Sequence, residues 1–466
     1  TLILTLFPYT TLFRSPLIVA VFVIGYLFIT LEDVIKVNKA AVALLMCVAC
    51  WVLYTLGAAE YVPMFYANEL KTSGEAVMNF VTSHILREHL GEISETLFFL
   101  MGAMTVVEII DTNGGFNFVR EALRSKTKRS LLWKIAFITF FLSAVLDNLT
   151  TTIVMIMVLR KLVYSREDRL YYVGLIVIAA NAGGAFSPIG DVTTIMLWIK
   201  GSVTAGGVMK EIFLASLAAM VVPALLLQYH LHGTLGSAEQ SEEKAVADVH
   251  QFSGFERRLI FFFGVGGLLF VPIFHSLTEL PPYLGILLVL GLLWTLTEVF
   301  YRTKKHRDST TKQRVATILR KIDMTTILFF LGILLAVATL KETGVLPAFG
   351  QWLNEVSGGN HYLVTGVIGV ASSIVDNVPL VAGCMNMYPI EAAGDFAQDG
   401  VFWQLLAYCA GVGGSMLIIG SAAGVVAMGL EKISFGWYLK NITWVAAVGY
   451  FAGIFIYWFE RAVIHM

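Results

Sequence analysis

Two Asp-Asn pairs, each flanked by short apolar arms, constrain the fold of this chain more than any other feature. The first pair lies in SAVLDNLTTTIVM, residues 143–155, and the second in SSIVDNVPL, residues 372–380. The arms around the first pair, WKIAFITFFLSAVL and TTTIVMIMVL, are each shorter than the roughly 20 residues that a membrane-spanning helix needs. This arrangement predicts a helical hairpin that enters a membrane and returns, with the Asp-Asn pair at its tip.

The composition supports a membrane setting. Of the 466 residues, 57% are hydrophobic and only 14% are charged, whereas soluble domains are about 45–50% apolar. The chain is therefore expected to be an all-α polytopic membrane protein that contacts the lipid bilayer. A net charge of -1 gives no reason to expect a nucleic-acid partner. The four cysteines lie in or beside apolar runs, which argues against a disulfide framework.

Apolar runs and polar interruptions divide the chain into segments. Residues 170–200 would form one long span, but NAGGAFSPIGDVTT interrupts it with glycines and a proline, so a broken helix is expected there. The predicted segments are a leader of uncertain origin (1–15), N-terminal scaffold helices (16–92), a first repeat (93–230), a polar loop (231–255), connecting helices with a basic cytoplasmic loop (256–322) and a second repeat (323–460).

The second half of the chain repeats the first at a nearly constant offset. The Asp-Asn pairs are 229 residues apart, whereas Gly183 and Gly413, and Gly114 and Gly344, are each 230 apart. Three short motifs that stay in step indicate an internal duplication. Basic residues flank the first hairpin but not the second, so the two hairpins are expected to enter from opposite sides, as in inverted-repeat transporters.

The hairpin tips and broken helices supply the oxygen ligands that a small hard cation such as sodium prefers. The candidate ion-binding and proton-coupling residues are Asp147, Asn148, Thr150, Asn181, Ser187, Asp191, Thr193, Thr194, Ser373, Asp376, Asn377, Ser415 and Ser421. Among them, Asp147, Asn148, Asp376 and Asn377 are the expected direct ligands of the metal ion.

The prediction of an ion-binding and proton-coupling site rests mainly on the acidic residues in this set. Acidic residues at membrane depth are functional by default, and burial disfavours their charged form, so they can take up a proton when no cation is bound. Ser and Thr in apolar helices also bond to their own backbone or bridge helices, which is an alternative role for Thr193, Thr194 and Ser421. Glu108 and His89 are candidates for tuning the pH response; alternatively, Glu108 is structural and His89 is a solvated residue at the membrane edge.

Four stretches resemble the NhaD-type sodium/proton antiporters of the ion transporter superfamily: LFFLMGAMTVVEIID, SAVLDNLTTTIV, NAGGAFSPIGDVTTIMLW and SSIVDNVPLVA. The resemblance extends over most of residues 16–460. It implies a dimer with a scaffold domain and a transport domain that moves like an elevator. Superfamily members that carry dicarboxylates have Ser-Asn-Thr at the hairpin tips, whereas this chain has Asp-Asn-Leu at 147–149 and Asp-Asn-Val at 376–378. The added negative charge favours a cation over an anionic substrate.

The sequence thus predicts a secondary transporter that exchanges sodium, or lithium, for protons by alternating access in a bacterial inner membrane. A sodium-coupled transporter of an anion or oxyanion on the same fold is the alternative. An enzyme is not expected, since the chain has no nucleophile and base set, no metalloprotease motif and no nucleotide-binding loop. Apart from sodium as a substrate, no cofactor is expected.

Overall fold

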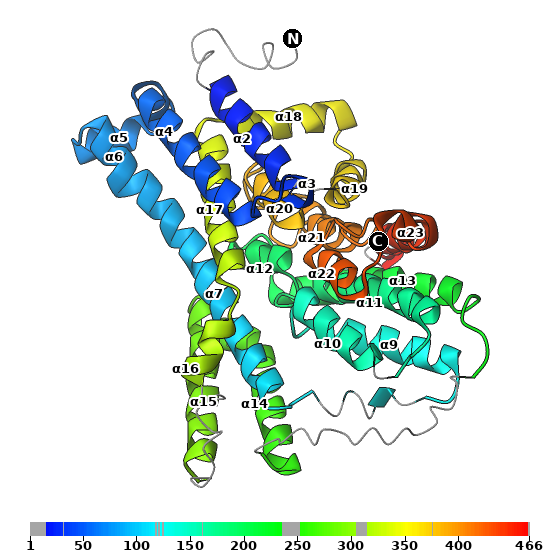
Figure 1. The fold of residues 1–466 in the computed structure, drawn as a ribbon. Helices are drawn as coiled ribbons and strands as arrows, with labels where there is room; N and C mark the ends of the chain where they lie inside the picture. The colour runs from blue at the N-terminus through cyan, green and yellow to red at the C-terminus, as the bar shows by residue number, and fades with distance from the viewer. Residues whose placement is uncertain are drawn as a thin grey trace. The chain divides into compact units, whose positions relative to one another are not determined.

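A computed structural model describes residues 15–234, 252–303 and 315–464, apart from Leu31, Asn117, Phe118, Arg120, Glu121, Arg124, Lys161 and Val375. The described residues form helices and connecting turns (Figure 1). They contain no strand, although Thr127 and Thr234 form an isolated β-bridge. The predicted leader lies outside these residues apart from Ser15, as do residues 235–251 of the predicted polar loop and residues 304–314 of the basic loop.

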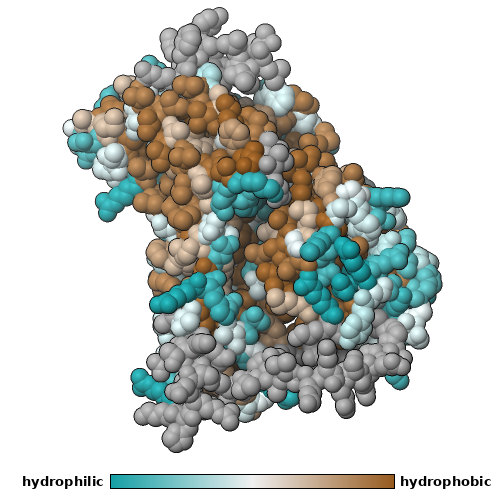
Figure 2. All heavy atoms as spheres, in the orientation of Figure 1, coloured by the Kyte–Doolittle hydropathy of each residue, from teal (hydrophilic) through white to brown (hydrophobic). Residues whose placement is uncertain are grey.

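Seven helices of the described chain are long and apolar enough to cross a membrane. They are α4 (Lys39–Phe65), the continuous stretch Val77–Thr112 that ends in α7 (Leu86–Thr112), α13 (Ala205–Leu227), α14 (Gly254–Thr278), α15 (Pro282–Thr303), α17 (Met324–Glu342) and α24 (Thr443–Ile464). Large apolar side chains remain exposed along them, and Figure 2 shows hydrophobic residues over much of the visible surface. The prediction of an all-α polytopic membrane protein is confirmed.

The helical stretch Val77–Thr112 is continuous. It includes both the amphipathic segment SHILREHLGEISE and the apolar run that follows it. α6 (Val77–Phe80) continues through a π-helical turn, Val81–Ile85, directly into α7. A single π turn can be accommodated within a helix without ending it, so the polar residues of this segment did not mark a boundary.

The chain forms two compact units, each assembled from separate segments. The first contains the described residues up to Phe98, then Asp323–Val364 and Val378–Ala392. In it, α17 packs against α4, and α4 also packs against α2 (Ser15–Thr30). Gly332 permits the close approach of α17, because a Cβ there would lie 2.8 Å from the Ala43 carbonyl carbon. The shorter elements of this unit are α3 (Glu32–Ile35), α5 (Ala67–Ser73), α6 and α18 (Val345–Ser357).

The second unit, Phe99–Ile322, Thr365–Asn377 and Ala393–Met466, contains both broken helices. The first is α11 (Arg166–Ala185) followed by α12 (Val192–Ile199), and the second is α21 (Val401–Gly413) followed by α22 (Ala422–Glu431). The first hairpin consists of α9 (Lys128–Ser143) and α10 (Asn148–Arg160). The remaining short elements are α16 (Val315–Ile318), the 3-10 turn Leu319–Lys321 and α23 (Phe435–Asn441).

The second hairpin consists of α19 (His361–Ser372) and α20 (Asn377–Met385), and its tip residues up to Asn377 belong to the second unit. The four arms of the two hairpins are 16, 13, 12 and 9 residues long. Each is shorter than the roughly 20 residues required to span a bilayer. The helical break at each Asp-Asn pair is therefore present where the sequence predicts it.

Equivalent positions of the two repeats make equivalent contacts. Ser143 Oγ donates to the Ala180 carbonyl at 2.6 Å, and Ser372 Oγ donates to the Ala410 carbonyl at 2.8 Å. Gly114 and Gly344, which the offset of 230 pairs, both have left-handed backbones, with φ of 73° and 74°. These matches are what the predicted duplication leads one to expect. The opposite membrane orientation of the two repeats stays a prediction.

Candidate functional site

Asp191 lies at the centre of a buried polar network in the second unit. It is the N-cap of α12, where its Oδ1 accepts a hydrogen bond from the Thr193 backbone N–H at 3.1 Å, and it is only 2% exposed. The chain breaks before it because the segment 186–190 contains Pro188 and Gly190, which do not continue a helix. The break therefore brings a carboxylate and a helix N-terminus to the same buried point.

Three asparagines and a serine complete the network. Asn148 Nδ2 donates to Asn181 Oδ1 at 3.0 Å and to Asp191 Oδ2 at 3.1 Å. Asn377 Nδ2 lies 3.4 Å from the same Asp191 oxygen, and Asn181 Nδ2 donates to Ser421 Oγ at 2.9 Å. All five side chains are buried. The network thus joins both hairpin tips to both broken helices.

Four of the five helices that carry these residues begin at the network, and the fifth, α11, ends beside it. Asn148 opens α10, Asn377 opens α20, Asp191 caps α12 and Ser421 caps α22. The N-terminus of a helix carries a partial positive charge and unpaired N–H groups. Four such ends therefore lie at the network, and one of them, that of α12, donates a backbone N–H to the Asp191 carboxylate.

Within the described part of the chain, no Lys, Arg or His side chain lies within ion-pair distance of Asp191. A buried carboxylate that lacks a counter-charge is costly in its ionised form. The site therefore has an electrostatic requirement that a bound cation or a proton on the carboxylate can satisfy.

The two tip acids have different surroundings. Asp147 is half-buried, and its two carboxylate oxygens accept hydrogen bonds from the backbone N–H and the hydroxyl of Thr150, both at 2.7 Å. Asp147 and Thr150 thus form a cap at the start of α10. Asp376 is also half-buried and lies one residue before Asn377. The Asp191 carboxylate, in contrast to a cap within one hairpin, accepts hydrogen bonds from residues of both hairpins.

Four predicted hydroxyl residues bond to nearby backbone. Ser187 Oγ donates to the Ala144 carbonyl, and Thr194 Oγ1 lies 3.4 Å from the Ala185 carbonyl. The other two bond within their own turns: Ser373 to Val370 at 2.7 Å and Ser415 to Val412 at 2.5 Å. Thr193 contributes its backbone N–H to Asp191. The four hydroxyls therefore support the turns that shape the site.

Glu108, a candidate for pH tuning, lies apart from this network. Its Oε1 accepts hydrogen bonds from Lys321 Nζ and from Thr112 Oγ1, both at 2.9 Å. Lys321 Nζ also donates to Thr112 at 2.9 Å. Glu108 thus belongs to a partly exposed ion pair near the end of α7.

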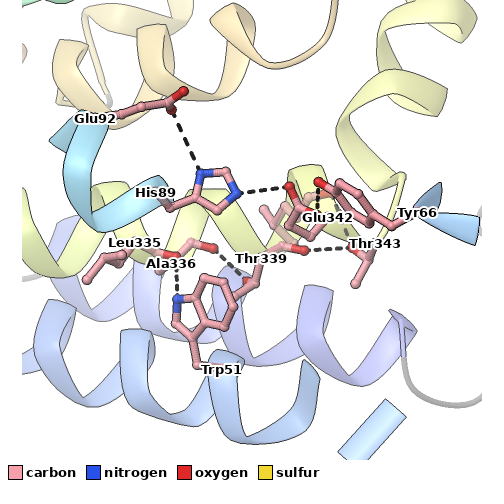
Figure 3. Close-up of polar contacts among 10 residues, drawn as sticks. Trp51, Tyr66, His89, Glu92, Leu335, Ala336, Thr339, Glu342 and Thr343 are labelled. Carbon is pink, nitrogen blue, oxygen red and sulfur yellow. Dashed lines mark hydrogen bonds and ion pairs between the residues drawn. The ribbon is translucent and has the colours of Figure 1, made fainter. Parts of the chain in front are cut away.

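His89, the other candidate for pH tuning, belongs to a polar cluster in the first unit (Figure 3). Its Nε2 lies 2.9 Å from Glu342 Oε1, and Tyr66 donates its hydroxyl to Glu342 Oε2 at 2.8 Å. His89 is 7% exposed and Glu342 is 4% exposed, so this pair is buried. The sequence analysis did not single out Glu342. An acid at the end of the apolar run LFFLGILLAVATLKE is the signal that could have found it.

Comparisons with known proteins agree with this architecture. The sequence model of the citrate transporter family (CitMHS) matches residues 26–403. Sodium/proton antiporter 1 of Arabidopsis thaliana is 44% identical over 436 residues, covering 94% of this chain and 71% of the relative. Na(+)/H(+) antiporter NhaD of Alkalimonas amylolytica is 30% identical, covering 96% of this chain and 91% of the relative.

The chain belongs to the NhaD-type sodium/proton antiporter family. This membership confirms the resemblance that the four motifs carry, and it confirms a transporter rather than an enzyme. Arabidopsis also has a second relative, sodium/proton antiporter 2, which is 43% identical and is matched over 97% of its length. Since NhaD-type relatives occur in both a plant and a bacterium, the bacterial inner membrane stays a prediction.

Proposed function

We propose that the protein is a secondary antiporter that exchanges sodium, or lithium, for protons at the Asp191 network. The observation that carries the proposal is a buried carboxylate with oxygen-rich neighbours and no cationic partner in the described chain. Sodium prefers oxygen ligands, and a carboxylate can bind either a cation or a proton. One group that must be neutralised by either ion is sufficient to couple their movements.

The coupling follows from the cost of moving the empty site. A bare carboxylate is expensive to carry through apolar surroundings. Movement would therefore be favourable with sodium bound or with the acid protonated, and unfavourable with neither. The names of the relatives, which are sodium/proton antiporters, support this substrate pair.

The proposed ligand set has an inner and an outer part. Asp191, Asn181 and Ser421 would supply oxygens directly, and Asn148 and Asn377 would present theirs after rotating their amides. The remaining candidates at the tips and turns, among them Asp147 and Asp376, would shape the entry of the ion or add negative charge. No group of three or more His, Cys, Asp or Glu side chains suited to a resident metal occurs among the described residues.

The contacts of the first hairpin support its proposed re-entry into the membrane. Lys128, at the start of α9, pairs with Asp168 in the first turn of α11 at 2.7 Å, and the tip residue Asn148 reaches Asn181 in the same helix. Asp168 and Asn181 are 13 residues apart in α11, which corresponds to about 20 Å of helix. This length is shorter than the hydrocarbon core of a bilayer, which is about 30 Å thick.

Inverted hairpins, alternating access by an elevator-like movement and a homodimer are parts of the same proposal. Labelling of single cysteines checks the hairpin: Ser125→Cys and Ser165→Cys should react with an impermeant reagent from the same face of the membrane. Labelling from opposite faces would show that the segment between them crosses it.

The alternative is a sodium-coupled anion transporter, which two observations favour: the citrate transporter description of the family and the four helix N-termini at the site. Proton flux in everted vesicles discriminates the two functions. If sodium alone dissipates a preformed proton gradient with no organic anion present, antiport is supported. If dissipation requires an added dicarboxylate, the alternative replaces it.

A further inference from the structure

Another buried carboxylate, Glu431, lies at the opposite end of α22 from the Asp191 network and is 4% exposed. Two arginines bind it from different helices. Arg160 Nε donates to Oε1 at 2.6 Å, and Arg169 Nε donates to Oε2 at 2.8 Å. Hydrogen bonds between charged partners are the strong ones in proteins. We refer to Glu431, Arg160 and Arg169 as the Glu431 clasp.

Arg160, which belongs to the clasp, and the nearby Arg166 also cap the end of α22. Arg160 donates an Nη2 hydrogen bond to the Leu430 carbonyl, and Arg166 Nη2 donates to the Lys432 carbonyl at 3.3 Å. The last carbonyls of a helix lack partners within it and carry a partial negative charge. Basic side chains at this position therefore hold the whole C-terminal turn of α22 as well as its last side chain.

The clasp joins two helices whose other ends form the ion site. α10 runs from Asn148 to Arg160, and α22 runs from its N-cap Ser421 to Glu431, with the two helices packed against each other (Figure 1). Thirteen and ten residues correspond to about 20 and 15 Å. Asn181 bonds to both Asn148 and Ser421 at the site. The clasp thus sets how far the two helices can slide past each other.

The corresponding region of the other repeat is also held by hydrogen bonds, at or within three residues of the matching positions. Gly201 lies 230 positions before Glu431 in the sequence. Asp399 lies 230 positions after Arg169. There, Gln398 Nε2 donates to the Gly201 carbonyl at 2.9 Å. Asp399 accepts hydrogen bonds from the backbone N–H and hydroxyl of Thr204, at 2.7 and 2.6 Å. In both regions, polar contacts tie the residues at or just after the end of the second half-helix to residues at the start of the other repeat's broken helix. Among the contacts described for these two regions, those of Glu431 are ion pairs and those of Gln398 and Asp399 are hydrogen bonds.

We propose that Glu431 is a positioning residue for sodium binding, which holds Asn148 and Ser421 in register through α10 and α22. This inference rests on the proposed antiport function. Mutation of groups that hold the ligating residues in place, but do not contact the metal themselves, commonly changes metal affinity by about 10- to 100-fold. Because the clasp acts over a helix length, a smaller effect is expected, about fivefold.

The test compares Glu431→Gln, Glu431→Asp and Glu167→Gln in proteoliposomes, with sodium-driven proton flux as the readout. Glu431→Gln should raise the KM for sodium about fivefold, with the maximal rate per folded protein within a factor of about two. Glu431→Asp, which keeps the charge, should recover most of the affinity. Glu167 is exposed in the first turn of α11, so Glu167→Gln removes the same charge beside the clasp and should leave the KM unchanged.

Arg160→Gln provides a milder variant, since it leaves Glu431 paired with Arg169. It should raise the KM in the same direction and by less. An unchanged sodium KM in Glu431→Gln, or a loss of thermal stability and maximal rate with the KM unaltered, would overturn the positioning role. Wild-type protein without any sodium-driven proton flux would instead refute the proposed function. The two failures are therefore distinguishable.

Discussion

The substitution Asp191→Asn tests the centre of the proposed mechanism. The side chains are nearly the same size, and Asn is as good an N-cap as Asp, so the hydrogen bond from Thr193 can persist. The amide cannot carry the exchanged proton, and it lacks the charge that attracts sodium. Sodium-driven proton flux should therefore fall to background while the protein remains folded.

The contacts of Asp191 set the expected effect on stability. Three donors face its carboxylate: Thr193 N and Asn148 Nδ2 at 3.1 Å, and Asn377 Nδ2 at 3.4 Å. Asparagine has a single acceptor oxygen, which can keep the Thr193 bond, so Asn148 and Asn377 must rotate their amides to accept from the new NH2 group. Each hydrogen bond to a charged group, which contributes about 1.5–3 kcal/mol, is then replaced by a neutral one of about 0.5–1.5 kcal/mol, a loss of about 3 kcal/mol in total. The substitution also removes the penalty for burying an unpaired charge, which favours the folded variant by several kcal/mol. These terms oppose each other, and the net change in the free energy of unfolding should stay within about 2 kcal/mol.

The assay pairs proton flux in proteoliposomes with thermal unfolding of the purified protein in detergent. Ser253→Ala is a matched control for capping, because Ser253 forms an exposed capping box at the start of α14. It should cost about 1 kcal/mol of stability and leave flux intact. Flux of wild-type size in Asp191→Asn would refute the reasoning, since an amide cannot exchange a proton for sodium.

The remaining predictions concern competition, packing and the cluster in the first unit. If one proton competes with one sodium, the apparent sodium affinity measured by calorimetry should weaken about tenfold, or 1.4 kcal/mol, per pH unit over the acidic range and level off at high pH. Affinity independent of pH from about 5 to 9, with no proton released, would indicate separate sites. Gly183→Ala places a Cβ 2.1 Å from the Phe140 carbonyl oxygen, whereas a Cβ at Gly206 meets nothing within 4 Å. The Gly183 variant should lose about 1–3 kcal/mol and most of its flux, with Gly206→Ala unaffected in flux; equal melting temperatures in the two variants would contradict the close packing. Glu342→Gln should cost about 1–3 kcal/mol, because it weakens the buried hydrogen bonds with His89 and Tyr66, and an unchanged melting temperature would contradict this role.

Local physical chemistry explains what the sequence alone could predict. Long apolar runs must form helices in a bilayer, because backbone groups there have no water to bond with. Glycines and a proline interrupt these helices, and the repeated motifs predict a duplication at an offset of about 230. The Asp-Asn breaks lie where they were predicted, as does the helix break before Asp191.

The roles of individual polar side chains depended on contacts between distant parts of the chain. The sequence ranks the tip acids first, yet the carboxylate of Asp147 faces Thr150 while that of Asp191 faces both tip asparagines. A composition or a spacing does not specify which way a side chain points. That direction depends on tertiary contacts such as the packing of α9 against α11, which the lack of a Cβ at Gly183 permits.

The two buried carboxylates that the sequence analysis did not select illustrate the same limit. Glu342 pairs with His89, 253 residues away, and Glu431 pairs with Arg160, 271 residues away. In the sequence, each is an acid at the end of an apolar run, a position equally compatible with exposure to water. Their burial and their partners were decided only by tertiary packing, because an ion pair forms wherever folding brings two charges together and excludes water around them.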